Sequence, residues 1–105
     1  MPDGSRRPVE PGDVFLLAAD GDDTLVRLRG KRPLHDVRPL GAVSARFEPH
    51  GFYRIHQRWA VNLRRLRAIR PRAAGDDWEV VLEPPVNRVL PVARARLAGL
   101  WARLE

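Results

Sequence analysis

Arginines are the side chains with the clearest chemistry in this sequence. Seven of them lie between residues 54 and 72, and the amides of Gln57 and Asn62 fall in the same stretch. A guanidinium group binds phosphates and guanine edges through paired hydrogen bonds, and an amide can read adenine. The stretch therefore indicates a surface that contacts a polyanion. A basic run is also typical of a solvated protein face, and the run alone does not separate the two interpretations.

The overall charge favours a polyanionic partner. The chain has 19 Lys+Arg residues against 13 Asp+Glu residues, which gives a net charge of +6, and Lys31 is its single lysine. An excess of positive charge attracts nucleic acids and anionic surfaces. Arginine richness also follows from GC-rich coding, so the composition has a second explanation.

Residues for covalent or metal-assisted catalysis are scarce. The sequence has no cysteine, and its two serines, Ser5 and Ser44, stand outside any nucleophile-elbow motif. The histidines His35, His50 and His56 do not have the spacing of a metal motif. We therefore predict that the protein is not an enzyme and needs neither a metal nor a cofactor.

The acidic loop from Asp20 to Asp23 has two interpretations. Its carboxylates could suggest a calcium site, but the glycine and the distal glutamate of an EF-hand loop are not at the required positions. A tight hairpin turn explains the same residues, because Asp and Gly tolerate unusual backbone angles. We favour the hairpin turn.

The apolar residues predict a mainly β protein. Short apolar or alternating runs indicate strands at 13–19, 24–29, 32–37, 52–55, 66–72, 78–83 and 88–92. The first two strands should pair as a hairpin, and so should 66–72 with 78–83. Pro33 cannot donate to a strand ladder, so the third strand should lie at a sheet edge.

Two helices complete the expected elements. A short helix is predicted over 39–47, with Pro39 as its first helical residue. An amphipathic helix should close the chain and cover the end of the sheet. Its apolar stripe consists of Leu97, Leu100, Trp101 and Leu104.

The chain is expected to form one domain. Residues 1–12, rich in proline and glycine, are predicted to be a flexible tail or linker to something larger upstream, and residues 13–105 to be the domain. No apolar run is long enough to cross a bilayer, and the N-terminus lacks the apolar core of a signal peptide. We therefore expect a cytoplasmic protein.

Two ordered motifs resemble the LytTR family of DNA-binding domains. In that family a segment close to F-x-R-x-H-R-S-x-x-V-N-L precedes an L-P-V-S-R segment. The first motif is matched by Phe52, Arg54, His56, Val61, Asn62 and Leu63, and the second by Leu90, Pro91, Val92 and Arg94. The loop at 19–21 and the short helix before Phe52 also fit, so the resemblance spans residues 13–104.

The resemblance implies an elongated fold of small antiparallel β-sheets with one short internal helix and a C-terminal amphipathic helix. Family members are usually output domains of bacterial response regulators, or are joined to membrane segments, and they regulate transcription. They enter successive major grooves with loops and often bind paired direct repeats in double-stranded DNA. The implied partners are thus such DNA, an upstream sensory or receiver domain or membrane segment, and a second copy in a dimer on DNA.

Contact residues follow from the resemblance by position. Base contacts are implied at the first hairpin loop, at the pair after the histidine and after the L-P-V segment, and phosphate contacts at two further arginines. His56 and Asn62 are expected to shape the turn rather than touch bases. The implied DNA-binding residues are Asp23, Thr24, Arg54, Gln57, Arg58, Arg72 and Arg94.

The sequence departs from the family pattern at three places. Asp23 puts a carboxylate where a groove-facing residue is expected, which repels phosphates unless it accepts from cytosine N4. Gln57-Arg58 replaces the common Arg-Ser pair, and Ala93 replaces a serine that could cap the last helix. The alternative function is a LytTR-like interaction module that binds a protein partner or an anionic membrane surface.

Overall fold

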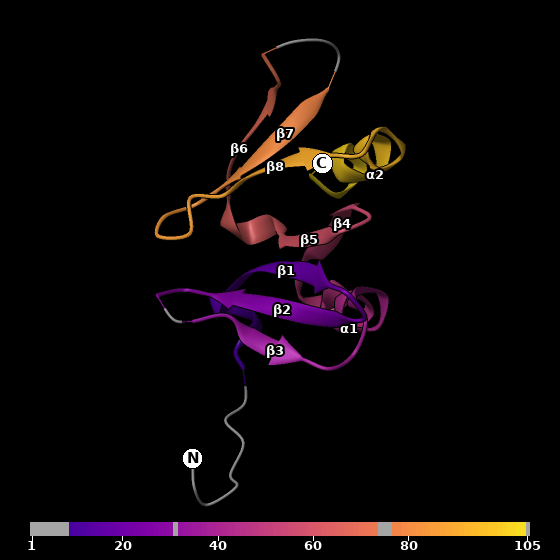
Figure 1. The fold of residues 1–105 in the computed structure, drawn as a ribbon. Helices are drawn as coiled ribbons and strands as arrows, with labels where there is room; N and C mark the ends of the chain where they lie inside the picture. Colours follow the sequence, from indigo (N-terminus) through magenta and orange to yellow (C-terminus); the bar gives the residue numbers. More distant parts are fainter. Residues whose placement is uncertain (1–8, 31, 74–76, 105) are drawn as a thin grey trace, which may run out of the picture.

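The computed structural model describes residues 9–30, 32–73 and 77–104, and shows an elongated molecule of 51 × 26 × 25 Å (Figure 1). Two antiparallel sheets lie one above the other along the long axis. The mainly β fold with two small sheets and two helices is therefore confirmed. Ser5, Lys31 and the centre of the predicted 73–77 turn lie outside the described residues.

The larger sheet has five strands in the order β3-β2-β1-β5-β4. Its strands are β1 (Val14–Asp20), β2 (Asp23–Leu28), β3 (Leu34–Asp36), β4 (Phe52–His56) and β5 (Trp59–Asn62). The predicted first hairpin is confirmed, because β1 pairs with β2 and Asp20 lies opposite Asp23. The predicted edge position of the third strand is also confirmed.

The smaller sheet has three strands in the order β6-β7-β8. They are β6 (Leu66–Pro71), β7 (Trp78–Leu82) and β8 (Val89–Val92). The predicted pairing of 66–72 with 78–83 is confirmed, with Ile69 opposite Val80. Strand β8 adds to β7 and ends directly before the last helix.

Two α-helices and three short 3-10 turns connect the strands. Helix α1 (Leu40–Phe47) begins after Pro39, which is in an extended conformation at the N-cap rather than at the first helical position as predicted. Helix α2 (Arg94–Leu104) begins three residues before its apolar stripe. The 3-10 turns are η1 (Pro11–Asp13), η2 (Glu48–His50) and η3 (Leu63–Arg65).

Strand β5 was missed by the sequence analysis, which predicts no strand between residues 55 and 66. Ala60 and Val61 are fully buried because β5 lies between β1 and β4 in the centre of the sheet. A four-residue strand buried on both faces has no clear alternation. Its pairing with β1, such as Leu16 opposite Val61, joins residues far apart in the sequence.

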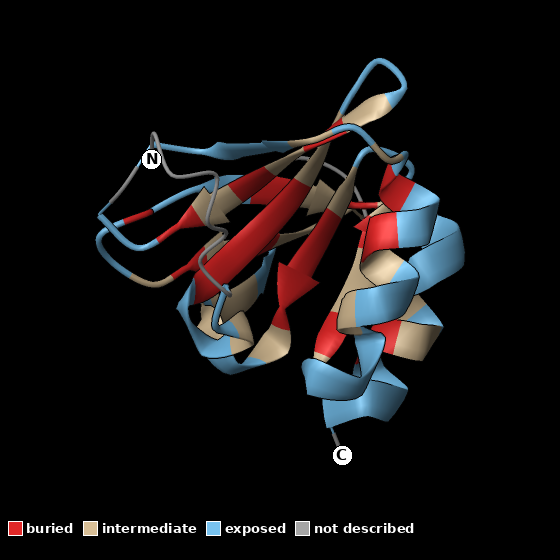
Figure 2. Ribbon diagram, turned by 90° about the horizontal axis from the view of Figure 1, so that it is seen from below, coloured by how far each residue is buried: buried red, intermediate tan, exposed pale blue. Residues whose placement is uncertain are grey.

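Strand β1 supplies both hydrophobic cores. Its register shifts between Val14 and Leu16, so Phe15 and Leu16 point into the same core and Val14 and Leu17 into the other. The first core lies between the two sheets and includes Leu100 of α2, and the second lies under α1. Figure 2 shows the buried residues running along the strands, with exposed residues along the helices.

Helix α2 packs against β4 and the smaller sheet. Leu100 is fully buried, and the Tyr53 hydroxyl donates to the Arg96 carbonyl over 2.9 Å. The end of the predicted stripe is less covered than expected, because Trp101 is 39% and Leu104 43% exposed. Trp101 contacts Trp78 edge to face, with ring centroids 5.1 Å apart, at the margin of the smaller sheet.

Candidate nucleic-acid interface

Three connections from both sheets meet on one side of the molecule, at one end of the strands (Figure 1). The β1–β2 turn lies beside the β4–β5 turn, where the Ala19 amide donates to the Arg58 carbonyl over 2.9 Å. The junction of β8 and α2 lies beside β4, where the Ala93 amide donates to the Ile55 carbonyl over 2.8 Å. We call this part, residues 19–24, 56–58 and 92–94, the loop end; it lies on the right of Figure 1.

The first loop is a tight hairpin turn. Gly21 has φ +61°, a left-handed conformation that glycine adopts without steric cost. Asp20 and Asp23 pair across the turn as the last and first residues of their strands. This pairing confirms the hairpin interpretation of the acidic loop.

Asp23 and Thr24 lie in different environments. The Asp23 carboxylate is 2.6 Å from His35 Nε2 and its side chain is 36% exposed. Thr24 is fully buried, and its hydroxyl donates to the Arg38 carbonyl over 2.8 Å. Thr24 therefore holds the β3–α1 segment against β2, and Asp23 is the member of this pair with access to a ligand.

The segment that Thr24 holds carries a second acid–base pair. Arg38 donates to both carboxylate oxygens of Asp36, from Nε over 2.9 Å and from a terminal nitrogen over 2.6 Å, and its backbone amide donates as well. This guanidinium pairing lowers the pKa of Asp36 from 3.8 to about 2. The two charges offset each other, so the pair fixes the backbone beside the first loop without adding net charge.

The β4–β5 turn is held from inside by Arg54 and His56. Arg54 donates to the Gln57 carbonyl over 2.6 Å and to the His56 carbonyl over 3.4 Å. His56 Nδ1 accepts from the Arg58 amide over 3.1 Å, and its ring packs on Trp59. The expectation that His56 shapes the turn is confirmed, and Arg54 also holds the turn.

Gln57 and Arg58 are exposed at the tip of this turn. Among the described residues their side chains make no hydrogen bond or ion pair within the chain. A turn fixed by internal hydrogen bonds therefore presents an amide and a guanidinium with their donors available. This is the chemistry required to read base edges.

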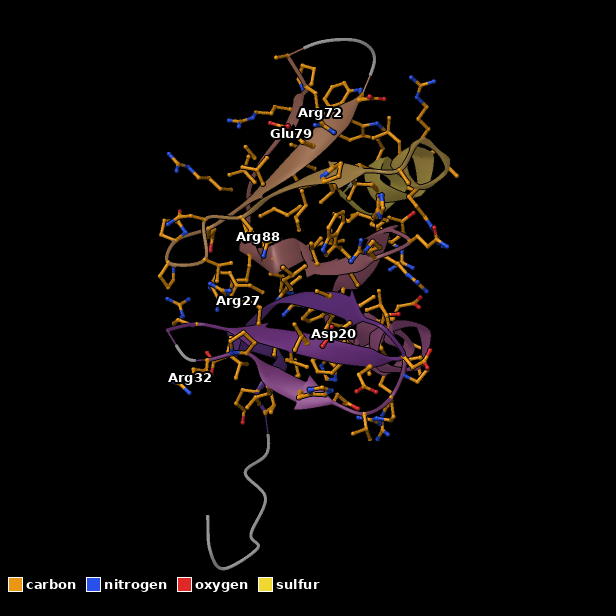
Figure 3. All side chains as sticks on the ribbon, viewed as in Figure 1. Asp20, Arg27, Arg32, Arg72, Glu79 and Arg88 are labelled. Carbon is orange, nitrogen blue, oxygen red and sulfur yellow. The ribbon has the colours of Figure 1, made fainter. Side chains whose placement is uncertain are left out.

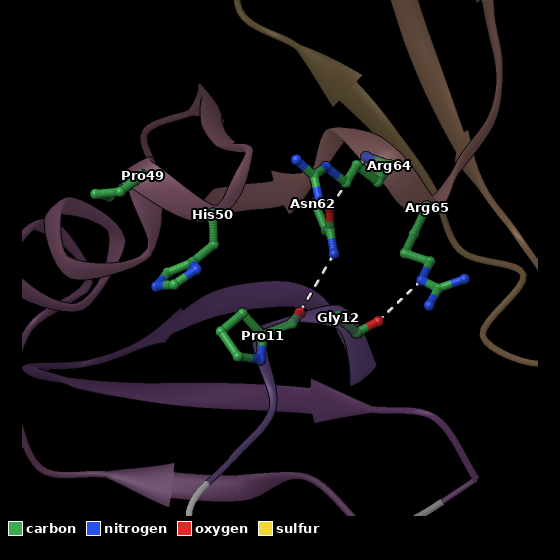
Figure 4. Close-up of a pocket in the computed structure, with 7 residues that line it drawn as sticks. All are labelled: Pro11, Gly12, Pro49, His50, Asn62, Arg64 and Arg65. Atoms are coloured by element: carbon green, nitrogen blue, oxygen red, sulfur yellow. Dashed lines mark hydrogen bonds between the residues drawn. The ribbon is translucent and has the colours of Figure 1, made fainter.

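Asn62 lies at the opposite end of the β4–β5 hairpin. Its amide nitrogen donates to the Val14 and Pro11 carbonyls over 3.0 and 3.4 Å, and its oxygen accepts from the Arg64 amide (Figure 4). Asn62 is 1% exposed, so the expectation of a structural role is confirmed. The packed part of the chain reaches at least to Pro11, within the segment expected to be a tail.

The two remaining predicted contact residues follow β6 and β8, the edge strands of the smaller sheet, and one of them begins α2. Arg94 is 79% exposed, with Nε 3.2 Å from Asp77. Arg72 follows the edge strand β6, and its Nε is 3.7 Å from Glu79, which also pairs with Arg70 over 2.7 Å (Figure 3). The structure thus brings Asp23, Gln57, Arg58 and Arg94 to one end. Arg72 lies at the same end of the smaller sheet, two strands from β8, and its amide donates over 2.8 Å to the carbonyl of Asp77, the ion-pair partner of Arg94.

Sequence analysis missed the contributions of His35 and Arg38. Both come from the β3–α1 region and reach the first loop only because β3 pairs with β2. The residues themselves are ordinary for an edge strand and its following turn. A prediction of the β2–β3 register, which places Thr24 opposite Asp36, is the signal that could have found them.

The fold and the loop end define a class of protein: an elongated β domain that gathers connections from two sheets at one end. The family model of the LytTr DNA-binding domain matches residues 4–105. The chain therefore belongs to the LytTr DNA-binding domain family.

A solved structure shares this fold. It is the LytTr DNA-binding domain of a protein described as a methyl-accepting/DNA response regulator from Bacillus cereus, with a TM-score of 0.71 and 19% sequence identity. The alignment covers 93% of this chain and 86% of the other. No curated protein matches the sequence. No helix among the described residues is long and apolar enough to span a membrane.

Proposed function

We propose that this domain binds double-stranded DNA in a sequence-specific manner and acts in bacterial transcription regulation. The observation that carries the proposal is the β4–β5 turn, which presents the exposed side chains of Gln57 and Arg58 on a backbone fixed by Arg54 and His56. Side chains on a rigid turn lose less conformational entropy when they bind a ligand. Membership of a DNA-binding family supports the same conclusion.

The loop end suits major-groove reading by side chains from three connections. Gln57 can pair with adenine N6 and N7, and Arg58 and Arg94 can pair with guanine O6 and N7. Arg94 must exchange its ion pair with Asp77 for a base or phosphate. Such an exposed pair contributes little stability, so the exchange has a low cost.

Asp23 and Thr24 have distinct roles in this proposal. Thr24 positions the first loop through Arg38, and Asp23 accepts a hydrogen bond from cytosine N4. His35 orients the Asp23 carboxylate. Arg54 fixes the turn and contacts phosphate with its remaining donors, and Arg72 contacts phosphate from the edge of the smaller sheet.

Selection from a random duplex library, followed by affinity measurements on two variants, tests the proposal. Arg94→Gln should cost about 1–3 kcal/mol of affinity for the selected site and relax preference at one base position. Arg72→Gln should weaken binding to all DNA sequences by a similar factor and reduce the slope of log K against log salt by about 1. If both variants bind every duplex like the wild type in a salt titration, these contacts are wrong. We also propose that the selected sites contain paired direct repeats bound by two copies.

One observation favours a second function. Apart from Asp36, whose charge Arg38 offsets, four carboxylates lie in or beside the loop end and oppose the approach of DNA phosphates, namely Asp20, Asp22, Asp23 and Asp77. A basic protein partner would suit them better. A gel shift against random duplex at low salt separates the two functions, since a DNA-binding domain shows at least non-specific binding under these conditions.

A further inference from the structure

The arginines are distributed unequally between the two ends of the strands. At the end opposite the loop end, the chain enters β1, leaves β2, passes through η3 and turns from β7 to β8. We call this the arginine end. Its basic residues are Arg27, Arg29, Arg32, Arg64, Arg65 and Arg88, and its carboxylates are Glu10, Asp13 and Glu83.

Hydrogen bonds tie these segments into one surface. The Arg29 amide donates to the Asp13 carbonyl over 3.1 Å, and Arg65 Nε donates to the Gly12 carbonyl over 2.9 Å. The Glu83 amide donates to the Arg65 carbonyl over 2.9 Å. Figure 3 places Arg27, Arg32 and Arg88 along the same edge of the molecule, on the left.

Packing fixes part of this charge in place. The guanidinium groups of Arg29 and Arg65 lie 5.4 and 5.5 Å from the centroid of the Phe15 ring, which belongs to the core between the sheets. Arg65 is also 3.7 Å from Glu83, the one ion pair among the described residues of this end. Arg27, Arg32 and Arg88 make no hydrogen bond or ion pair with their side chains within the described chain.

Two hollows at this end are lined without any carboxylate. A groove of about 280 Å³ lies between Arg27 and Arg32 on one side and Pro85 and Val86 on the other. A second hollow of about 400 Å³ is lined by His50, Arg64 and Arg65, which are its charged or titratable residues (Figure 4). Surfaces that offer only positive charge favour oxyanions such as phosphates.

We propose that the arginine end binds the phosphate backbone of a second duplex segment, so that one domain contacts DNA at both ends. This inference rests on the proposed function. Strand β1 has seven residues, so the two ends are roughly 20 Å apart, and a straight duplex at the loop end cannot reach the other end.

The surface chemistry favours nucleic acid over a protein partner. Protein interfaces have an apolar centre, whereas DNA interfaces are more polar and more positive. Of the six large exposed apolar side chains in the described chain, Val37, Trp101 and Leu104 lie elsewhere. Val9, Leu34 and Val89 lie at or beside the arginine end, on three separate segments, and six arginines outnumber them there.

A bridging assay tests this inference. A duplex carrying the selected site is immobilised, the protein is bound to it, and capture of a fluorescent duplex of unrelated sequence is measured. The triple variant Arg27→Gln, Arg32→Gln, Arg88→Gln should bind the immobilised duplex within about twofold of wild type and capture at least tenfold less of the second duplex. Each lost phosphate contact also lowers the salt slope of capture by about 0.9.

A matched control removes the same charge elsewhere. The variant Arg46→Gln, Arg70→Gln, Arg103→Gln should bridge like the wild type. A loop-end variant, Gln57→Ala with Arg94→Gln, should lose its preference for the selected site but still bind duplex of unrelated sequence. Circular dichroism checks that all variants are folded.

The outcomes separate this inference from the proposed function. If the wild type holds no duplex of any sequence, both are wrong. If it selects a site but the triple variant bridges normally, only the second surface is wrong. If the triple variant also fails to bind the immobilised duplex, the arginine end and the loop end form a single DNA interface, and the inference is wrong. If polyglutamate displaces the second duplex from the wild type more strongly than free duplex does at equal charge, the arginine end is a site for an acidic protein, and the inference is also wrong.

Discussion

At the scale of single residues, charge pairing decides which side chains are available for binding. Asp36 and Arg38 pair with each other, whereas Gln57 and Arg58 keep their donors because Arg54 and His56 supply the contacts that hold the turn. Asp23 is only partly available for binding, because its side chain is partly exposed but its carboxylate is bonded to His35. The two family motifs are visible in the sequence, but only the geometry shows which of their side chains hold the turn and which stay exposed.

The Asp36–Arg38 pair should make stability depend on pH in the acid range. Pairing lowers the pKa of Asp36 from 3.8 to about 2 in the folded protein, so the stabilisation is full above about pH 4 and is lost as the pH falls through 2. Urea denaturation midpoints of the wild type and Asp36→Asn measure it. The difference between the urea midpoints of the two proteins should become smaller from pH 5 to pH 2. A difference that stays constant over this range would contradict the lowered pKa of Asp36.

At the scale of elements, the position of α2 depends on how it starts and on what it packs against. Helix α2 begins at Arg94, so Ala93 stands at the N-cap, and the Ala93 carbonyl accepts from the Arg96 amide over 2.8 Å. Further along the helix, Gly99 packs against the Tyr53 ring of β4. Ala93 belongs to the loop end, and Gly99 places the helix against β4, the strand that leads into the β4–β5 turn.

Ala93→Ser should stabilise the protein by about 1 kcal/mol. A serine hydroxyl at the N-cap accepts from a backbone amide in the first helical turn that alanine leaves unbonded. Thermal or urea unfolding measures the change. Ala98→Ser, an exposed position inside the same helix, is the control and should destabilise by about 0.5 kcal/mol through lower helix propensity. A lower midpoint for Ala93→Ser would argue against the cap.

Gly99→Ala should destabilise the protein by about 1–3 kcal/mol, although alanine normally favours a helix. A methyl group at this position would overlap the Tyr53 hydroxyl, which is held by its bond to the Arg96 carbonyl. Gly41→Ala in α1 is the matched control, because its methyl would make only ordinary contact, 3.5 Å from Arg54. Equal midpoints for the two variants would show that Tyr53 moves freely.

At the scale of the whole molecule, two sheets share one core and their connections are sorted to opposite ends. Phe15 of the larger sheet, Val80 of the smaller sheet and Leu100 of α2 meet in this core, so the sheets hold the three loops in a constant relation. The same antiparallel topology sends most of the free arginine charge to the other end. Two ends with different charge are consistent with two distinct DNA contacts, one that reads sequence and one that holds the backbone.

The sequence by itself determined what depends on neighbouring residues. The hairpins, the edge strand at Pro33, the helices and the family motifs follow from alternation, turn residues and helical spacing within a few positions. The tertiary structure alone decided the rest. Strand β5 is central because it pairs with β1, Thr24 is buried by the 36–38 segment, and His35 reaches Asp23 through β2–β3 register. These contacts join residues far apart in the chain, where local patterns carry no information, and the same pairings set the charge of each end.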